Sequence, residues 1–186
     1  MNNQSHDLSA LFRTPERVTL LSIALTRHAC TEQQVAGKAG ISKGLASQYL
    51  ALLEREGLLA RKDDRTYRII PSARTAAIKR ILNIDRVLAF FKKPAWALGT
   101  GMYGSWAEGT NTEESDLDLW VFVKEPPAGT AVAEAERTVS RALSVEVHLL
   151  VISREKIDGM KKNDEPFYRL FSRQSITLDG ESPEAA

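Results

Sequence analysis

The sequence is poor in the residues that form cross-links and metal clusters. Among its 186 residues there is one cysteine, Cys30, and the three histidines are scattered along the chain. A single cysteine cannot form an intrachain disulfide, and with so few histidines it cannot form a thiolate zinc site. The sequence therefore excludes disulfide-stabilised scaffolds and zinc fingers.

Long hydrophobic runs are missing as well. No apolar stretch approaches the ~20 residues that a bilayer span requires, and the N-terminal segment MNNQSHDLSA lacks the basic and hydrophobic regions of a signal peptide. We therefore expect a cytoplasmic protein. Hydrophobic residues make up 43% of the chain and charged residues 26%, as in ordinary folded proteins, and the length allows one or two domains.

The net charge of +1 conceals an uneven distribution. Residues 1–93 contain 16 Lys and Arg against 8 Asp and Glu, whereas residues 94–186 contain 9 against 16. A basic half suggests a polyanionic partner, and an acidic half suggests chemistry that uses carboxylates, although solvated surfaces would give the same bias.

Capping signals predict three helices in the basic half. The first begins at Pro15, the second lies between Thr31 and Gly40, and the third lies between Ser42 and Gly57. The apolar stripe of the third helix consists of Leu45, Tyr49, Leu52 and Leu53. Two short strands, 58–61 and 66–70, are expected to follow it as a hairpin with a polar, basic turn.

Three helices followed by a hairpin, with the stretch GISKGLASQYLALLEREGLL, resemble the winged helix-turn-helix domains of bacterial and archaeal transcription regulators. The resemblance covers about residues 14–71 and implies binding to double-stranded DNA. The third helix can approach a major groove, and the hairpin can reach the flanking phosphates. The candidate DNA-binding residues are Lys43, Gly44, Ser47 and Gln48 on the helix and Arg61, Lys62 and Arg65 on the hairpin. The alternative is a dimerisation or protein-docking module.

A connecting helix is expected over residues 72–93, and a short strand over residues 96–102. The next candidate strand, 116–123, has Asp116 and Asp118 at alternate positions. Both carboxylates then lie on one face, about 6.6 Å apart along the backbone. There they can bind the magnesium ions that assist phosphoryl displacement. Acidic residues at the start of a strand are also commonly just solvated.

Two further elements complement this pair. Gly104 and Ser105 form a small-residue turn that opens a helix, and such a turn exposes backbone N–H groups to phosphate. Glu146 is the only acid in the candidate strand 145–152, where a carboxylate is costly to bury unless it is paired or binds a cation. Glu146 is therefore a candidate third metal ligand. His148 lies on the same face, where a histidine is more often structural than catalytic.

The Gly-Ser pair, the Asp-x-Asp pair and the later acid together resemble the nucleotidyltransferases of the DNA polymerase beta superfamily, and the minimal nucleotidyltransferases in particular, over about residues 75–180. The resemblance implies that Gly104 and Ser105 bind the phosphates of a nucleoside triphosphate. It also implies that Asp116, Asp118 and Glu146 bind Mg²⁺, and that a nucleotide monophosphate passes to a hydroxyl acceptor on a protein or nucleic acid. Glu146 is the candidate for assisting deprotonation of that hydroxyl.

Two positions depart from the family's pattern. The family usually has a basic residue in the loop where this chain has Trp106 and Glu108, and its third carboxylate is usually aspartate. Both departures bear on activity more than on fold, because a misplacement of 1 Å can cost ~100-fold in rate.

We therefore expect an α+β protein with a winged helix-turn-helix domain at residues 1–71, a connecting helix at 72–93 and a minimal nucleotidyltransferase domain with a small mixed sheet at 94–186. One alternative is a transcription regulator whose second domain only senses nucleotide or mediates assembly. Another is a toxin–antitoxin component that modifies a partner toxin while its winged helix represses the operon.

The carboxylate face is expected to continue into an apolar patch. Strand alternation places four large side chains beyond the acidic residues, namely Trp120, Phe122, Leu150 and Ile152. Helices are expected mainly on the opposite face, so this patch needs a cover. Burial by the segment 167–171 or by the winged helix is one expectation, and a homodimer or another partner protein is the alternative.

Overall fold

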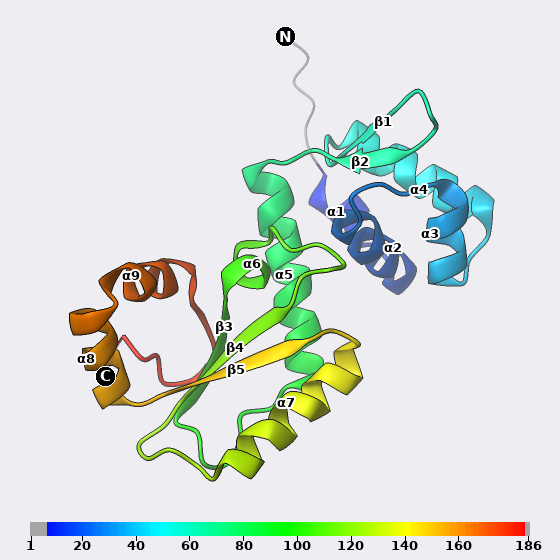
Figure 1. Ribbon diagram of the computed structural model, residues 1–186. Helices are drawn as coiled ribbons and strands as arrows, with labels where there is room; N and C mark the ends of the chain where they lie inside the picture. Colours follow the sequence, from blue (N-terminus) through cyan, green and yellow to red (C-terminus); the bar gives the residue numbers. More distant parts are fainter. Residues whose placement is uncertain (1–6, 185–186) are drawn as a thin grey trace. The chain divides into compact units, whose positions relative to one another are not determined.

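The computed structural model describes residues 7–184, which fold into two compact units that meet within helix α5 (Ala73–Phe90). The first unit ends at Lys79 and the second begins at Arg80, both in α5 (Figure 1). None of the helices in the described part of the chain is both long and apolar enough to cross a membrane.

The N-terminal unit consists of short helices and one hairpin, and the predicted capping residues begin its helices. The side chains of Thr14, Thr31 and Ser42 each accept a hydrogen bond from a backbone N–H of the helix that follows. This confirms the three helix starts. The elements are α1 (Leu8–Leu11), α2 (Pro15–Thr26), α3 (Glu32–Ala39), α4 (Lys43–Arg55), β1 (Leu59–Arg61) and β2 (Tyr67–Ile69).

The apolar stripe of α4 differs from the expected one. Leu45 is 41% exposed, whereas Ala46 and Leu50 are buried. The prediction for Leu45 was wrong because Ala46, Tyr49, Leu50 and Leu53 follow the i, i+3, i+4, i+7 spacing that sets the buried face, which leaves Leu45 at its edge.

Helix α1 was not anticipated; its buried Leu11 accepts a hydrogen bond from the Tyr49 hydroxyl at 2.7 Å.

The β1–β2 hairpin is antiparallel, as expected, and is fixed to the rest of its unit by a cysteine. Cys30 and Tyr67 exchange two backbone hydrogen bonds, with N···O distances of 3.0 and 2.8 Å. At the turn, Arg65 adopts a left-handed conformation with φ 62°. The hairpin therefore has a defined position against the segment between α2 and α3.

The second unit is built on a four-stranded sheet with the order β5-β4-β3-β6. Strands β3 and β4 are antiparallel, as are β3 and β6, whereas β4 and β5 are parallel and are joined through α7. The elements are β3 (Gly99–Tyr103), α6 (Gly104–Glu108), β4 (Leu117–Phe122), α7 (Gly129–Leu143), β5 (Val147–Ile152), α8 (Arg154–Asn163), α9 (Glu165–Gln174) and β6 (Ile176–Gly180). Strand β3 starts later than expected because residues 94–97 form a turn.

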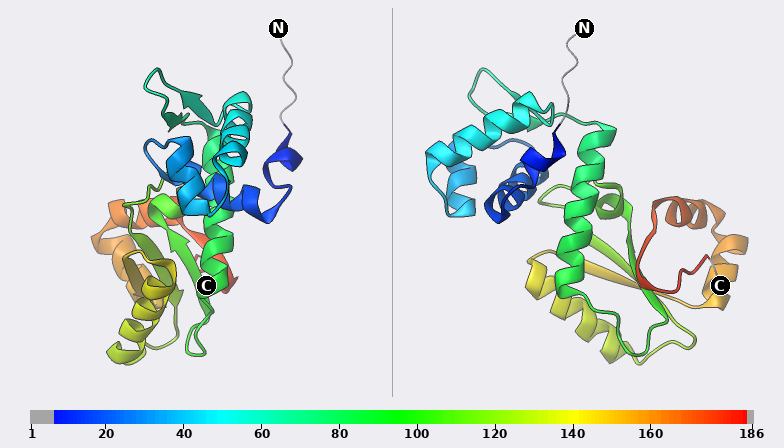
Figure 2. Two further views of the ribbon diagram at one scale, coloured as in Figure 1. Left: turned by 90° about the vertical axis from the view of Figure 1, so that its right-hand side faces the viewer. Right: turned by 180° about the vertical axis from the view of Figure 1, so that it is seen from behind.

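Helices cover both faces of this sheet. One face packs on the C-terminal part of α5 and on α7, in a core that contains Val87, Leu119 and Leu143. The other face is covered by α8 and α9, and Figure 2 shows these two helices and α7 on opposite sides of the sheet. The mixed sheet of the prediction is therefore confirmed, and its helices are distributed more evenly than expected.

The expected apolar patch is buried within the chain. Trp120, Phe122 and Ile152 are at most 3% exposed and pack against Ile157 of α8 and Phe171 of α9. This confirms burial by the segment 167–171, together with α8. The patch therefore gives no reason to expect a homodimer.

Close packing at the centre of the sheet depends on a glycine. Gly101 pairs with Trp120, and a Cβ atom at Gly101 would lie 2.2 Å from the Trp120 ring and 2.2 Å from the Ile176 carbonyl oxygen. No side chain other than hydrogen fits between a buried indole and a neighbouring strand at such distances.

We predict that Gly101→Ala destabilises the protein by about 3 kcal/mol, because overpacking displaces a buried ring or a strand. Gly159→Ala is the matched control. Gly159 lies inside α8 with no atom within 4 Å of a Cβ, so alanine should stabilise by about 0.5–1 kcal/mol. Urea unfolding measures both changes. Equal stability of the two variants would contradict the packing of Trp120 on Gly101.

Candidate functional site

The predicted carboxylates and the glycine turn meet at one end of the sheet. Strand β3 ends at Tyr103, and Gly104 and Ser105 begin α6 directly after it. Strand β4 runs antiparallel to β3, so that Asp118 near its start pairs with Tyr103. Across the parallel β4–β5 pair, Asp118 lies beside His148. Tyr103, Asp118 and His148 thus form one row across three strands, on the same face as Trp120.

Gly104 is in direct contact with Asp118. Its φ is 68°, a left-handed conformation that favours glycine, and a Cβ atom there would lie 2.8 Å from Asp118 Oδ2. Helix α6 has no side-chain cap, and Ser105 is half-buried at its first turn. Backbone N–H groups and a carboxylate therefore lie together, as a site for a phosphate with a bound cation requires.

Burial raises the pKa of Asp118, and the nearby charge of Asp116 raises it further, while His148 lowers it. Burial and the charge of Asp118 likewise raise the pKa of Tyr103 to about 12. Asp116 lies before β4 with its side chain 51% exposed. The ionised site is thus poor in compensating positive charge, which a cation would supply.

The structure corrects the placement of Glu146. This residue precedes β5, which begins at Val147, and its side chain is 71% exposed. The inference from the cost of burying Glu146 was therefore wrong, because water solvates the carboxylate. The residue on the strand is His148, whose Nε2 lies 3.7 Å from Asp116 Oδ2 and 3.8 Å from Glu146 Oε1. Sequence analysis treated this histidine as structural, although strand alternation already placed it on the carboxylate face.

The donor set fits a cation that arrives with its substrate. No three His, Cys, Asp or Glu side chains within residues 7–184 are grouped so that they could hold a metal ion by themselves. Asp116 and Asp118 still supply carboxylate oxygens at one end of the sheet. Mg²⁺ is usually bound by one or two carboxylates together with substrate phosphates and water. The two aspartates match that pattern.

Buried amides hold the glycine turn in place. Asn83 of α5 donates hydrogen bonds from Nδ2 to the Trp106 carbonyl oxygen at 2.8 Å and to Asn111 Oδ1 at 2.9 Å. Trp106 is itself buried, and its Nε1 donates to the Ser115 carbonyl oxygen at 3.4 Å. Where the family usually has a basic residue, this chain thus has a core residue that connects α6 to the segment before Asp116. The sequence analysis missed both asparagines, because nothing in local spacing identifies them.

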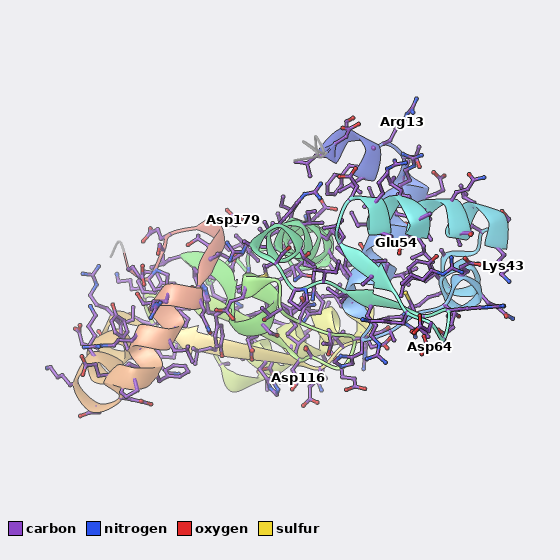
Figure 3. The ribbon with its side chains drawn as sticks, turned by 90° about the horizontal axis from the view of Figure 1, so that it is seen from above. Arg13, Lys43, Glu54, Asp64, Asp116 and Asp179 are labelled. Carbon is purple, nitrogen blue, oxygen red and sulfur yellow. The ribbon has the colours of Figure 1, made fainter. Side chains whose placement is uncertain are left out.

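The candidate DNA-binding residues gather around the start of α4 and the hairpin. Lys43, Arg61 and Arg65 line one cavity of about 390 Å³ together with the first residues of α3. Gly44, Gln48 and Lys62 are exposed. Ser47 is half-buried and donates a hydrogen bond to Glu32 Oε1 at 2.9 Å, so its hydroxyl is engaged within the unit. Figure 3 labels Lys43 at the start of α4 and Asp64 at the hairpin turn.

Part of the second unit is similar to a known protein family. A family model described as nucleotidyltransferase domain matches residues 84–172. The matched segment contains the glycine turn, both aspartates, Glu146 and His148. No curated protein matches the sequence.

Several solved structures resemble part of the chain. A toxin–antitoxin complex with AMP-PNP is 17% identical, with 55% of this chain and 77% of that chain covered and a TM-score of 0.41. The tri-AMPylated Shewanella oneidensis HEPN toxin in complex with MNT antitoxin is 15% identical. This match covers 57% of this chain and 76% of that chain, with a TM-score of 0.39. The toxin–antitoxin MntA–HepT is 16% identical, with 54% of this chain and 73% of that chain covered and a TM-score of 0.37.

We predict that Asp118→Asn raises the melting temperature of the ligand-free protein by roughly 2 °C, because it removes a half-buried charge that Asp116 repels. A group whose pKa is raised on folding destabilises the fold when it ionises. The difference from wild type should therefore shrink as the pH falls through the raised pKa. Asp158→Asn, at an exposed position of α8, is the control. A lower melting temperature at neutral pH would contradict this account of Asp118.

Proposed function

We propose that the second unit is a Mg²⁺-dependent nucleotidyltransferase that moves a nucleotide monophosphate from a nucleoside triphosphate to a hydroxyl acceptor. The observation that carries the proposal is the contact between Gly104 and Asp118. A Cβ atom at Gly104 would lie 2.8 Å from Asp118 Oδ2, so a phosphate-binding turn and a metal-binding carboxylate share one site. The match of residues 84–172 to a nucleotidyltransferase domain supports the same chemistry.

Each residue at the end of the sheet has a role in this proposal. Backbone N–H groups at Gly104 and Ser105 bind the phosphates, and Asp116 and Asp118 hold Mg²⁺, which neutralises charge on the phosphate oxygens when bound. The acceptor oxygen loses its proton and bonds to the α-phosphorus, and pyrophosphate leaves. Glu146 is the candidate from the sequence for accepting that proton. The structure adds His148 as a second candidate, since its Nε2 is 3.7 Å from Asp116 Oδ2.

We further propose that the N-terminal unit is a winged helix-turn-helix domain that binds double-stranded DNA. Three capped helices followed by an antiparallel hairpin support this proposal. So does the shared cavity of Lys43, Arg61 and Arg65, because its three cations outnumber its one acidic residue, Glu32, and can attract phosphate. The enzyme would thereby be tethered to DNA.

A second candidate function is a DNA-binding regulator whose second unit binds nucleotide without transferring it. Two observations favour it. Glu146 lies outside β5 and is largely solvated, so it is not held in place as a third ligand. In addition, Glu108 and the buried Trp106 stand where the resemblance predicts a basic residue. Such a regulator could belong to a toxin–antitoxin pair, in which a partner toxin would be the acceptor if transfer occurs.

Label transfer separates the two candidates. The full chain, Mg²⁺ and a native lysate are incubated with ATP labelled at either the α- or the γ-phosphate. Because pyrophosphate leaves, we predict transfer of the α-label alone to a protein or nucleic acid. Asp118→Asn should reduce transfer at least ~100-fold, as expected when a metal ligand is lost. Asp158→Asn should transfer as wild type does. Nucleotide binding without α-label transfer would favour the regulator.

A further inference from the structure

A second cavity borders α4, and Gln48 is the one residue lining it that the sequence analysis selected for DNA binding. It has a volume of about 360 Å³ and is lined by residues of α2 and α4 and by the segment around α1. Three arginines contribute to it: Arg13 and Arg17 from around the start of α2 and Arg55 from the end of α4. Among the described residues that line this cavity, none is acidic. Its positive charge is therefore not neutralised locally, which favours an anionic ligand.

The three arginines are not equivalent. Arg17 donates a hydrogen bond to the Ala10 carbonyl oxygen at 2.6 Å, and its guanidinium lies 5.7 Å from the centre of the Tyr49 ring. It is thus held as part of the cavity wall. Arg13 and Arg55 are exposed, and within residues 7–184 neither guanidinium group makes a hydrogen bond or ion pair. Their guanidinium groups can reach a ligand without breaking an internal contact.

The cavity lies beside the solvent-facing stripe of α4. Gly44, Gln48, Ala51 and Arg55 are all exposed and follow helical spacing, so they form one stripe along the helix. Of these, Gln48, Ala51 and Arg55 also line the cavity. The cavity of Lys43, Arg61 and Arg65 is separate and involves the hairpin. In Figure 3, Arg13 and the hairpin residue Asp64 are on opposite sides of α4.

Basic groups on both sides of a helix match the shape of a DNA groove. An α-helix with its side chains is roughly 10–12 Å across, and the major groove is about 12 Å wide, with a phosphate strand along each edge. We propose that Arg13 and Arg55 contact the phosphates of one DNA strand while the hairpin side contacts the other. The inference rests on the proposed DNA binding of the N-terminal unit and adds two residues to its interface.

The test measures how the affinity for DNA depends on salt. Fluorescence anisotropy follows binding of the full chain to a pool of mixed-sequence duplexes over a series of NaCl concentrations. Three double variants each remove two positive charges: Arg13→Gln with Arg55→Gln, Lys43→Gln with Arg65→Gln, and Lys162→Gln with Arg173→Gln. The third pair lies on exposed positions of α8 and α9 and controls for net charge.

We expect the first two variants each to weaken binding about tenfold at low salt and to reduce the slope of log K against log[salt] by about 2, because each phosphate contact contributes ~0.9. The control should retain the wild-type slope. Circular dichroism should show unchanged melting for the first variant, since both arginines are exposed.

Three outcomes would overturn the inference in different ways. If wild type binds DNA and only the Lys43 and Arg65 variant loses slope, DNA binding stands and Arg13 and Arg55 are not part of it. If wild type binds no duplex at low salt, the DNA-binding proposal fails as well. Equal losses in all three variants would show a net-charge effect and would also overturn the inference.

Discussion

The contact between Gly104 and Asp118 is the constraint on which the rest of the second unit depends. It exists because β3 and β4 pair antiparallel with Tyr103 opposite Asp118, which brings the end of one strand to the start of the other. The left-handed φ of Gly104 then turns the chain into α6 beside the carboxylate. The buried hydrogen bond from Asn83 to the Trp106 carbonyl oxygen holds that turn from the opposite side. A small shift in any of these elements would separate the glycine turn from the Asp118 carboxylate.

One face of this sheet carries a polar row of side chains and, beside it, a buried apolar row. On the face covered by α8 and α9, the row of Tyr103, Asp118 and His148 is polar, and the next row along β4 begins with the buried Trp120. Burial of Asp118 is the main cause of its raised pKa, and the charge of Asp116 raises it further. The two aspartates therefore repel one another when both are ionised. A ligand that brings positive charge together with phosphate would relieve this repulsion.

Local signals predicted much of this structure, and long-range placement explains what they missed. Caps such as Thr31 with Gln34 act within one turn of helix, so the sequence alone identified them correctly. The Asp-x-Asp pair was likewise readable from strand alternation. Glu146 was misplaced because the start of β5 depends on its pairing with β4 rather than on its own residues. Asn83 bonds to Trp106 and Asn111, which lie 23 and 28 residues away in the sequence, and no spacing rule identifies such partners.

Nucleotide and Mg²⁺ are proposed to share the site formed by Gly104, Asp116 and Asp118. Calorimetric titration of a non-hydrolysable ATP analogue into the full chain, with Mg²⁺ and then with chelator, tests this proposal most directly. The account predicts binding at least about tenfold tighter with Mg²⁺, since carboxylates and phosphates repel one another without it. It also predicts loss of binding in Gly104→Ala, whose Cβ would lie 2.8 Å from Asp118 Oδ2, and normal binding in Gly159→Ala. Equal affinity with and without Mg²⁺, or no binding by wild type in either condition, would contradict it.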